Sequence, residues 1–181
     1  MSQFEEKQIE REEIFDGAVL HVVKDKVLLP DGNTSYREFC LHKGAVAVIP
    51  ITEDNEIILV RQFRYAHHRE FLEIPAGKFD FVGEEPLEAA KRELSEETGA
   101  VAGKYTSLGI LDTTPALIDE IIHLYMAEEL TFGKMHPDED EFLSVERISL
   151  KDALGMVMRG EIRDGKTQIA ILKAAIIKGI Y

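Results

Sequence analysis

The chain has 181 residues, a formal net charge of −13 at pH 7 and a single cysteine. This length fits one domain with at most a small addition, and one cysteine excludes an intramolecular disulfide and favours a reducing compartment. The negative charge repels nucleic-acid phosphate, so we expect no nucleic-acid partner. It also repels an anionic substrate unless cations lie between the two. No apolar run approaches the roughly 18 residues of a membrane span, and the acidic start has no signal-peptide core, so we expect a cytoplasmic protein without membrane contact.

The N-terminal region, residues 1–43, is predicted to form a small antiparallel β subdomain. Residues 18–29 alternate in a way that favours a strand, "PDGN" at residues 30–33 indicates a turn, and residues 34–42 are predicted to return as a second strand. Two strands alone are marginally stable in water. We therefore expect this β-hairpin to be completed by dimerisation, which makes the protein a homodimer.

Residues 44–181 are predicted to form the main domain. The almost wholly apolar "AVAVIPIT" at residues 45–52 indicates a strand buried on both faces. Further strands are predicted at residues 57–65, 71–77, 105–111, 121–130 and 143–150. A helix is predicted at residues 86–98, and two more helices follow the last strand. This order predicts an α/β layered sandwich with a mixed sheet.

The helix predicted at residues 86–98 carries a dense group of acids. Glu93, Glu96 and Glu97 stand at i, i+3 and i+4, so their carboxylates fall within about a 100° sector, where like charges repel. An apolar stripe adjoins this sector and consists of Leu87, Ala90 and Leu94. A solvated helix face is one interpretation, because glutamate is a good helix former. The other is a cleft in which clustered carboxylates bind Mg²⁺ or Mn²⁺ and Arg92 holds one acid in place.

The stretch "GKFDFVGEEPLEAAKRELSEETGA" resembles the signature of the Nudix hydrolase family, G-x5-E-x7-R-E-U-x-E-E-x-G-U, in which U is apolar. Gly77 opens the signature, Glu84 and Arg92 stand at its first acid and its arginine, and Ala100 closes it. One difference is that six residues, not five, separate Gly77 from Glu84. The resemblance implies a Nudix-type α/β/α sandwich and cleavage of a nucleoside diphosphate linked to another group.

The resemblance also implies roles for individual residues. The implied ligands of Mg²⁺ (or Mn²⁺) are Glu93, Glu96, Glu97 and the carbonyl group of Ala76. The implied catalytic residues within the signature are Glu97 and Arg92, and the implied supporting residues are Gly77 and Glu84. Bound metal neutralises carboxylates and pyrophosphate and lowers the pKa of a bound water. The expected chemistry is therefore attack of that water on phosphorus.

Outside the signature, the chain resembles the ADP-ribose pyrophosphatase branch of the family. Pro115 lies sixteen residues after Gly99, where this branch has a proline, and "EIPAG" and "VRQFRY" are similar to branch motifs. The resemblance implies ADP-ribose as the small-molecule substrate and AMP and ribose 5-phosphate as products. It also implies substrate contacts from Arg37, Arg64 and Glu73. Read without the family, Pro115 is an ordinary loop proline, the arginines are solvated, and Glu73 is structural. Arg61 and Arg64 are three residues apart, so a strand would send them to opposite faces.

The acidic "DEDEF" at residues 138–142 is a further candidate. It is either a solvated loop or, as the branch resemblance implies, the source of a catalytic glutamate, with Glu141 as the match and Glu139 as the alternative. Such a loop carboxylate would orient or deprotonate the attacking water. Two other functions stay open: hydrolysis of another nucleoside diphosphate sugar or dinucleotide, and nucleotide sensing without turnover.

Overall fold

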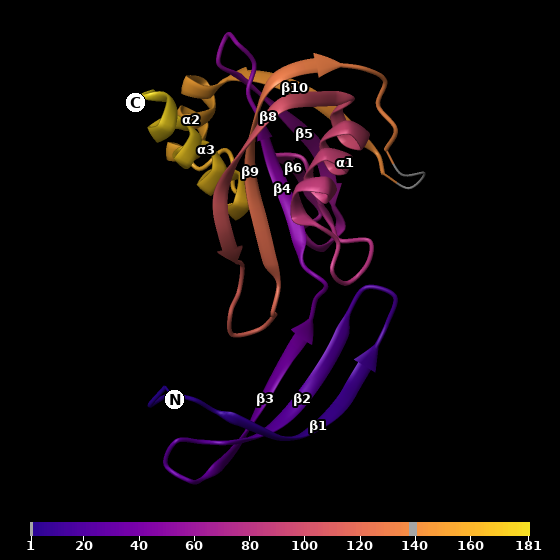
Figure 1. Ribbon diagram of the computed structural model, residues 1–181, viewed down its shortest axis with the longest axis vertical. Helices are drawn as coiled ribbons and strands as arrows, with labels where there is room; N and C mark the ends of the chain where they lie inside the picture. The colour runs from indigo at the N-terminus through magenta and orange to yellow at the C-terminus, as the bar shows by residue number, and fades with distance from the viewer. Residues whose placement is uncertain (1, 138–140) are drawn as a thin grey trace. The chain divides into compact units, whose positions relative to one another are not determined.

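The computed structural model describes residues 2–137 and 141–181 and divides the chain into two compact units (Figure 1). The first comprises Met1–Lys43 and Asp112–Ile121, and the second comprises Gly44–Leu111 and Ile122–Tyr181. The segment Asp112–Ile121 falls with the first unit, although the sequence boundary at residue 43 assigned it to the main domain. No helix in the described part of the chain is long and apolar enough to cross a membrane.

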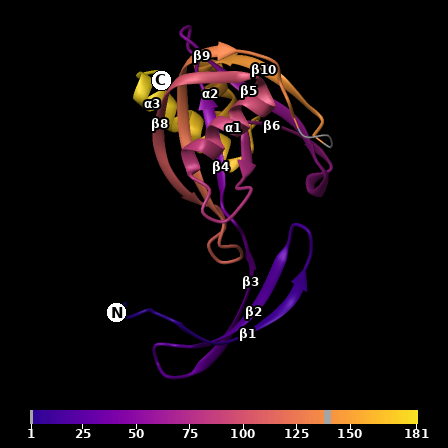
Figure 2. The same cartoon turned by 45° about the vertical axis from the view of Figure 1, so that its right-hand side comes forward.

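The first unit contains a three-stranded antiparallel sheet rather than the expected two-stranded hairpin (Figure 2). Its strands, in sheet order, are β1 (Lys7–Asp16), β2 (His21–Leu28) and β3 (Thr34–Leu41). The sequence did not predict β1, because this charged segment lacks a clean alternation. Arg11 on β1 binds the buried Asp25 of β2 through two contacts of 2.7 Å, Nε to Oδ1 and Nη2 to Oδ2. This bidentate pair holds β1 on the sheet and lowers the pKa of Asp25.

In its described residues, the second unit contains two sheets and three α-helices. The mixed sheet, in spatial order, is β7 (Ala76–Lys78), β4 (Ala45–Pro50), β9 (Ile121–Phe132) and β8 (Ala100–Asp112). The antiparallel sheet is β10 (Leu143–Ser149), β5 (Glu56–Arg64) and β6 (Arg69–Glu73). The helices are α1 (Pro86–Thr98), α2 (Leu150–Met158) and α3 (Gly165–Lys178). In the mixed sheet, β4 runs parallel to β9 and antiparallel to β7.

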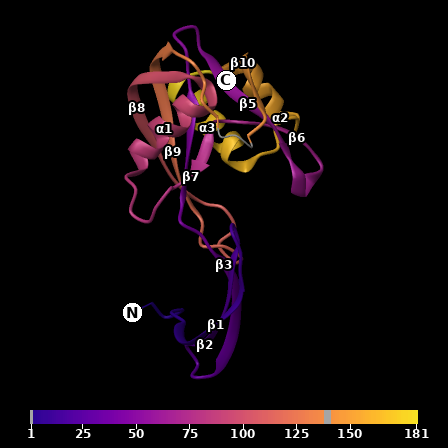
Figure 3. The same cartoon turned by 90° about the vertical axis from the view of Figure 1, so that its right-hand side faces the viewer.

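Strand β4 separates two hydrophobic cores, and all six of its residues are buried. Ala45, Ala47 and Ile49 face a core that contains α2 and α3. Val46 and Val48 face a smaller core that contains α1. Figure 3 shows α1 and the α2–α3 pair on opposite sides of this sheet. The expected α/β/α sandwich with a mixed sheet is therefore confirmed.

Helix α1 begins and ends where its sequence predicts. Pro86 occupies the first turn, where its missing N–H is not needed. Gly99 ends the helix in the left-handed region at φ 69°, and its N–H donates to the carbonyl of Ser95 at 2.8 Å. A Cβ on Gly99 would lie 2.6 Å from the carbonyl oxygen of Gly133. Both the conformation and the close approach therefore require glycine here.

Candidate active site

The acid face of α1 lies against β7, and two of its three glutamates are buried. Glu93 is 8% exposed and Glu97 is 3% exposed. The N–H of Ala76 donates to Oε2 of Glu97 at 3.3 Å. A Cβ on Gly77 would lie 2.0 to 2.4 Å from the carboxylate atoms of Glu93. The glycine that opens the signature therefore leaves the space that this carboxylate fills.

Too little positive charge lies near the two buried carboxylates, Glu93 and Glu97, to compensate their ionised forms. Burial, followed by the negative charges of Glu141 and Glu93, raises the pKa of Glu97 to about 8. Burial also raises the pKa of Glu93 to about 7, because the attraction of Arg92 offsets only part of that cost. Raised carboxyl pKa values mean that the ionised forms are poorly compensated inside the protein. A cation placed between these groups would lower both values.

Arg92 supplies part of the missing charge and connects the signature acids. Its Nη1 lies 2.7 Å from Oε1 of Glu93 and 3.3 Å from Oε2 of Glu96, and its Nε lies 3.4 Å from Oε1 of Glu84. Glu84 also accepts the N–H of Asp80 at 2.8 Å, which closes the loop before α1. The extra residue lies within this loop, and Glu84 still reaches Arg92.

The first residues of the loop between β9 and β10 are hydrogen-bonded to the C-terminal end of α1. The N–H of Gly133 donates to the carbonyl of Gly99 at 2.7 Å, and the N–H of His136 donates to the carbonyl of Glu96 at 2.9 Å. After this anchor, Glu141 lies close enough to Glu93 and Glu97 for its charge to raise both pKa values. Glu139, the alternative loop acid, lies outside the described residues.

Another buried carboxylate, Glu73, ends β6 beside this group. Arg64 binds it through Nε and Nη2, both at 2.8 Å, and Nζ of Lys166 lies 2.5 Å from its Oε2. Burial would raise the pKa of Glu73, but the bonds from Arg64 and Lys166 outweigh it and hold the value at about 2. Arg64 and Lys166 also interact electrostatically with Glu97. The Glu73 cluster therefore adjoins the acid face of α1.

Lys166 was not predicted from the sequence. Asp164 caps α3 by accepting the N–H of Thr167 at 2.9 Å, and the Thr167 hydroxyl oxygen accepts the N–H of Ile74 at 2.9 Å. These bonds place the first turn of α3 at the end of β6 and bring Lys166 to Glu73. The sequence contained one signal that Lys166 has a special role: it stands in the first turn of a helix, where a cation is unfavourable.

The other predicted arginines have different surroundings. Arg61 binds Glu146 at 2.5 Å and also pairs with Glu70, so it does not share the partner of Arg64. Arg37 belongs to the first unit, where Nη1 donates to the carbonyl of Tyr36 at 2.9 Å and Nη2 pairs with Glu6. Its role as a substrate contact stays a prediction.

The donor atoms at α1 suit a divalent metal ion, although the side chains do not form a closed cage. Among residues 2–137 and 141–181, no three His, Cys, Asp or Glu side chains are gathered as a metal site. The carboxylates of Glu93 and Glu97 are nevertheless hard oxygen donors with poorly compensated charge, which is what Mg²⁺ and Mn²⁺ prefer.

Comparisons with known proteins agree with this geometry. A family model described as the NUDIX domain matches residues 41–168. The chain is 46% identical over 173 residues to an ADP-ribose pyrophosphatase of Bacillus subtilis (strain 168), which covers 94% of this chain and 93% of that protein. It is 45% identical over 170 residues to a methanol dehydrogenase activator of Bacillus methanolicus, with coverage of 93% and 91%.

A solved structure shares the fold. The crystal structure of an ADP compounds hydrolase superposes with a TM-score of 0.85 at 23% identity, and the match covers 99% of this chain and 97% of that one. Together with the family match over residues 41–168, these likenesses agree with the signature at Gly77–Ala100 and with the layered fold. The chain belongs to the Nudix family.

Proposed function

We propose that this protein is a cytoplasmic, divalent-metal-dependent ADP-ribose pyrophosphatase that forms AMP and ribose 5-phosphate. The observation that carries the chemistry is the burial of Glu93 and Glu97 side by side with raised pKa values. Such a pair is held ionised at neutral pH by a bound cation. The likeness to an ADP-ribose pyrophosphatase along nearly the whole chain supports the substrate.

The proposed metal ligands are Glu93, Glu96, Glu97 and the carbonyl of Ala76. Nudix hydrolases generally need a divalent metal, and the oxygen donors favour Mg²⁺ or Mn²⁺ here. When bound, the ion supplies charge neutralisation, polarises a phosphoryl oxygen and lowers the pKa of water.

The remaining residues position the substrate and move the proton. Arg92 holds Glu93 and Glu96 in place through its contacts at 2.7 and 3.3 Å. Glu141, whose charge acts on Glu97, would accept the proton of the attacking water. Arg64 would contact a substrate phosphate, because guanidinium N–H groups suit phosphate oxygens. Glu73 would hold that arginine in position.

We also propose that the protein is a homodimer formed through the first unit. All ten residues of β1 are exposed at an edge of the sheet, and Ile9, Ile14 and Phe15 are each more than half exposed. An exposed apolar edge strand favours pairing with another chain. In such a dimer, Arg37 would contact substrate.

Light scattering at micromolar protein should give twice the chain mass, and Ile14→Asp should shift the protein toward monomer. A monomeric wild type would refute the proposed dimer.

The activity is tested by incubating the purified protein with ADP-ribose and Mg²⁺ in ¹⁸O-labelled water. We expect AMP and ribose 5-phosphate, with one labelled oxygen in one of the two products. Turnover of another nucleoside diphosphate sugar or dinucleotide without AMP from ADP-ribose would reject the substrate and keep the chemistry. Bound but intact ADP-ribose after long incubation with Mg²⁺ or Mn²⁺ would instead indicate a sensor.

A further inference from the structure

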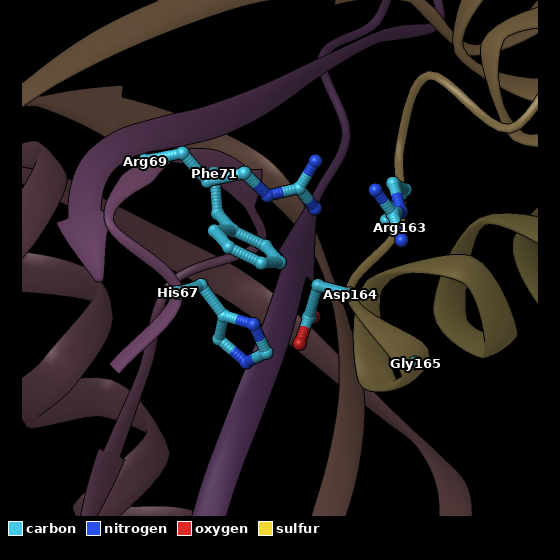
Figure 4. A pocket seen from close by; sticks show the side chains of 6 residues that line it. All are labelled: His67, Arg69, Phe71, Arg163, Asp164 and Gly165. Carbon is cyan, nitrogen blue, oxygen red and sulfur yellow. The ribbon is translucent and has the colours of Figure 1, made fainter. Parts of the chain in front are cut away.

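A groove beside the Glu73 cluster is lined by residues to which the proposed hydrolysis gives no role. Its lining comes from the β5–β6 connection, from β6 and from the start of α3, and consists of His67, Arg69, Phe71, Arg163, Asp164 and Gly165 (Figure 4). The volume of about 500 Å³ lies within the range of small-molecule sites. An adjoining cavity of about 440 Å³ shares His67, Phe71 and Asp164 and extends to Glu73 and Lys166.

Two guanidinium groups face each other across this groove. Figure 4 shows the Arg69 side chain extending from β6 toward Arg163 on the loop before α3. Within the described part of the chain, neither guanidinium group forms an ion pair or a side-chain hydrogen bond. The chain has 34 acidic residues against 21 basic ones. Two facing cations that pair with no described carboxylate are therefore unexpected, and an anion between them would remove their repulsion.

Among the described residues that line the groove, Asp164 alone carries a carboxylate, and this group is already engaged. Asp164 accepts the N–H and hydroxyl of Thr167 at 2.9 and 2.6 Å and pairs with Lys166 at 3.1 Å. Its charge is thus directed to the cap of α3 and to the ammonium group. Neither arginine therefore has an anionic partner among the described lining residues.

The floor of the groove is aromatic. Cζ of Arg69 lies 4.3 Å from the centroid of the Phe71 ring, and the His67 and Phe71 rings lie 5.1 Å apart. Stacking on Phe71 fixes the guanidinium plane of Arg69 and leaves its N–H groups at the edge available for hydrogen bonds. The half-buried Phe71 and the exposed His67 offer ring surface to a flat group beside the anion.

We propose that this basic groove is a second anion site, which binds the phosphomonoester of a nucleotide between Arg69 and Arg163 while the base lies against Phe71 and His67. Guanidinium groups bind phosphate through paired N–H donors. The phosphomonoester has two sources: a free mononucleotide such as AMP, or an extra phosphate on the distal part of an extended substrate. The site lies in one compact unit and does not depend on turnover at α1.

The binding test uses the full-length protein in EDTA, with AMP titrated by calorimetry. We expect Arg69→Gln/Arg163→Gln to weaken AMP binding at least tenfold. Arg159→Gln is the matched control, because Arg159 pairs with Glu161 outside the groove, and it should bind AMP as the wild type does. Glu97→Gln should also bind AMP normally, which separates this site from product binding at α1.

A kinetic test with Mg²⁺ distinguishes the two sources of phosphate. A tenfold loss of kcat/KM for ADP-ribose 2′-phosphate, with kcat/KM for ADP-ribose unchanged in the double variant, would assign the site to an extended substrate. Weaker AMP binding with both kcat/KM values unchanged would assign it to a free nucleotide. Equal AMP affinity in the wild type and the double variant, or no AMP binding to the wild type at millimolar nucleotide, would overturn the proposal. Because binding is measured in EDTA, a failure to hydrolyse ADP-ribose would reject only the proposed function.

Discussion

Replacing Glu97 with glutamine should stabilise the protein in EDTA while it removes activity. The pKa of this carboxyl is about 8 in the folded protein and 4.5 without the surroundings of the fold. A raised acid pKa means that the folded state retains a proton that the unfolded chain has lost, so the stability penalty grows as pH rises from about 4.5 to about 8. At pH 7 the penalty is about 3 kcal/mol, because each pKa unit corresponds to about 1.4 kcal/mol. Glutamine of the same shape carries no such penalty.

The assay is thermal and urea unfolding in EDTA at pH 5 and pH 8. At pH 8 the penalty grows to about 4 kcal/mol, which for a chain of this size corresponds to roughly 8–16 °C in Tm. Glu97→Gln should gain this stability over the wild type at pH 8 and gain less than about 1 kcal/mol at pH 5. With Mg²⁺, the wild type should recover stability at pH 8 and the variant should not, and ADP-ribose hydrolysis by the variant should fall at least 100-fold, about 2.7 kcal/mol.

Glu96→Gln is the matched control, because the Glu96 side chain is 37% exposed and pairs with Arg92. Its effect on stability in EDTA should be small and similar at both pH values. Parallel stability curves for the wild type and Glu97→Gln between pH 5 and pH 8 would refute the reasoning. The ionised carboxyl would then cost nothing to bury, and the argument for a compensating cation would fail.

Three further predictions concern the surrounding contacts. Gly77→Ala should lower metal affinity and kcat at least tenfold, because its Cβ would displace the Glu93 carboxylate. The control Gly133→Ala, whose Cβ would have its nearest contact at 3.6 Å, should leave both unchanged. Equal metal titrations of the two variants would contradict this. Glu73 has a lowered pKa of about 2, so it should contribute about 3 kcal/mol of stability above pH 5 that is lost as pH falls to 2; acid unfolding of Glu73→Gln should lack this component. Lys166→Met should cost about 1–3 kcal/mol in urea unfolding, because it leaves Glu73 with one cation, and Lys166→Arg should restore most of it; an unaffected Met variant would show that Arg64 suffices.

The fold was largely predictable because most of its signals are local. The boundaries of α1 follow from Pro86 and Gly99, and the burial of β4 follows from its apolar run. Strand β1 was missed because its ten residues are all exposed and lack apolar alternation. Its pairing with β2 and the contact between Arg11 and Asp25, fourteen residues away, identify it as a strand. A single-sequence pattern does not contain that contact.

The candidate site divides in the same way. Glu93, Glu96 and Glu97 are neighbours on one helix, so their spacing alone placed them together. Lys166 lies 93 residues after Glu73, and its contact depends on how α3 packs at the end of β6. Arg64 and Glu73 were each predicted as substrate contacts, and in the structure they also bind each other. Such pairings arise from tertiary packing and have no signature in the sequence.

Strand β4 acts as a partition between two parts of the molecule that can be altered separately. Ala47 and Ile49 pack toward the helix that carries Lys166, and Val46 and Val48 pack toward the helix that carries Glu93 and Glu97. Substitutions at adjacent residues of this strand would therefore change the packing of different cores. A library of variants at alternate positions of β4 would displace either the helix that carries Lys166 or the helix that carries Glu93 and Glu97. Tolerance to mutation along this strand should therefore follow a period of two.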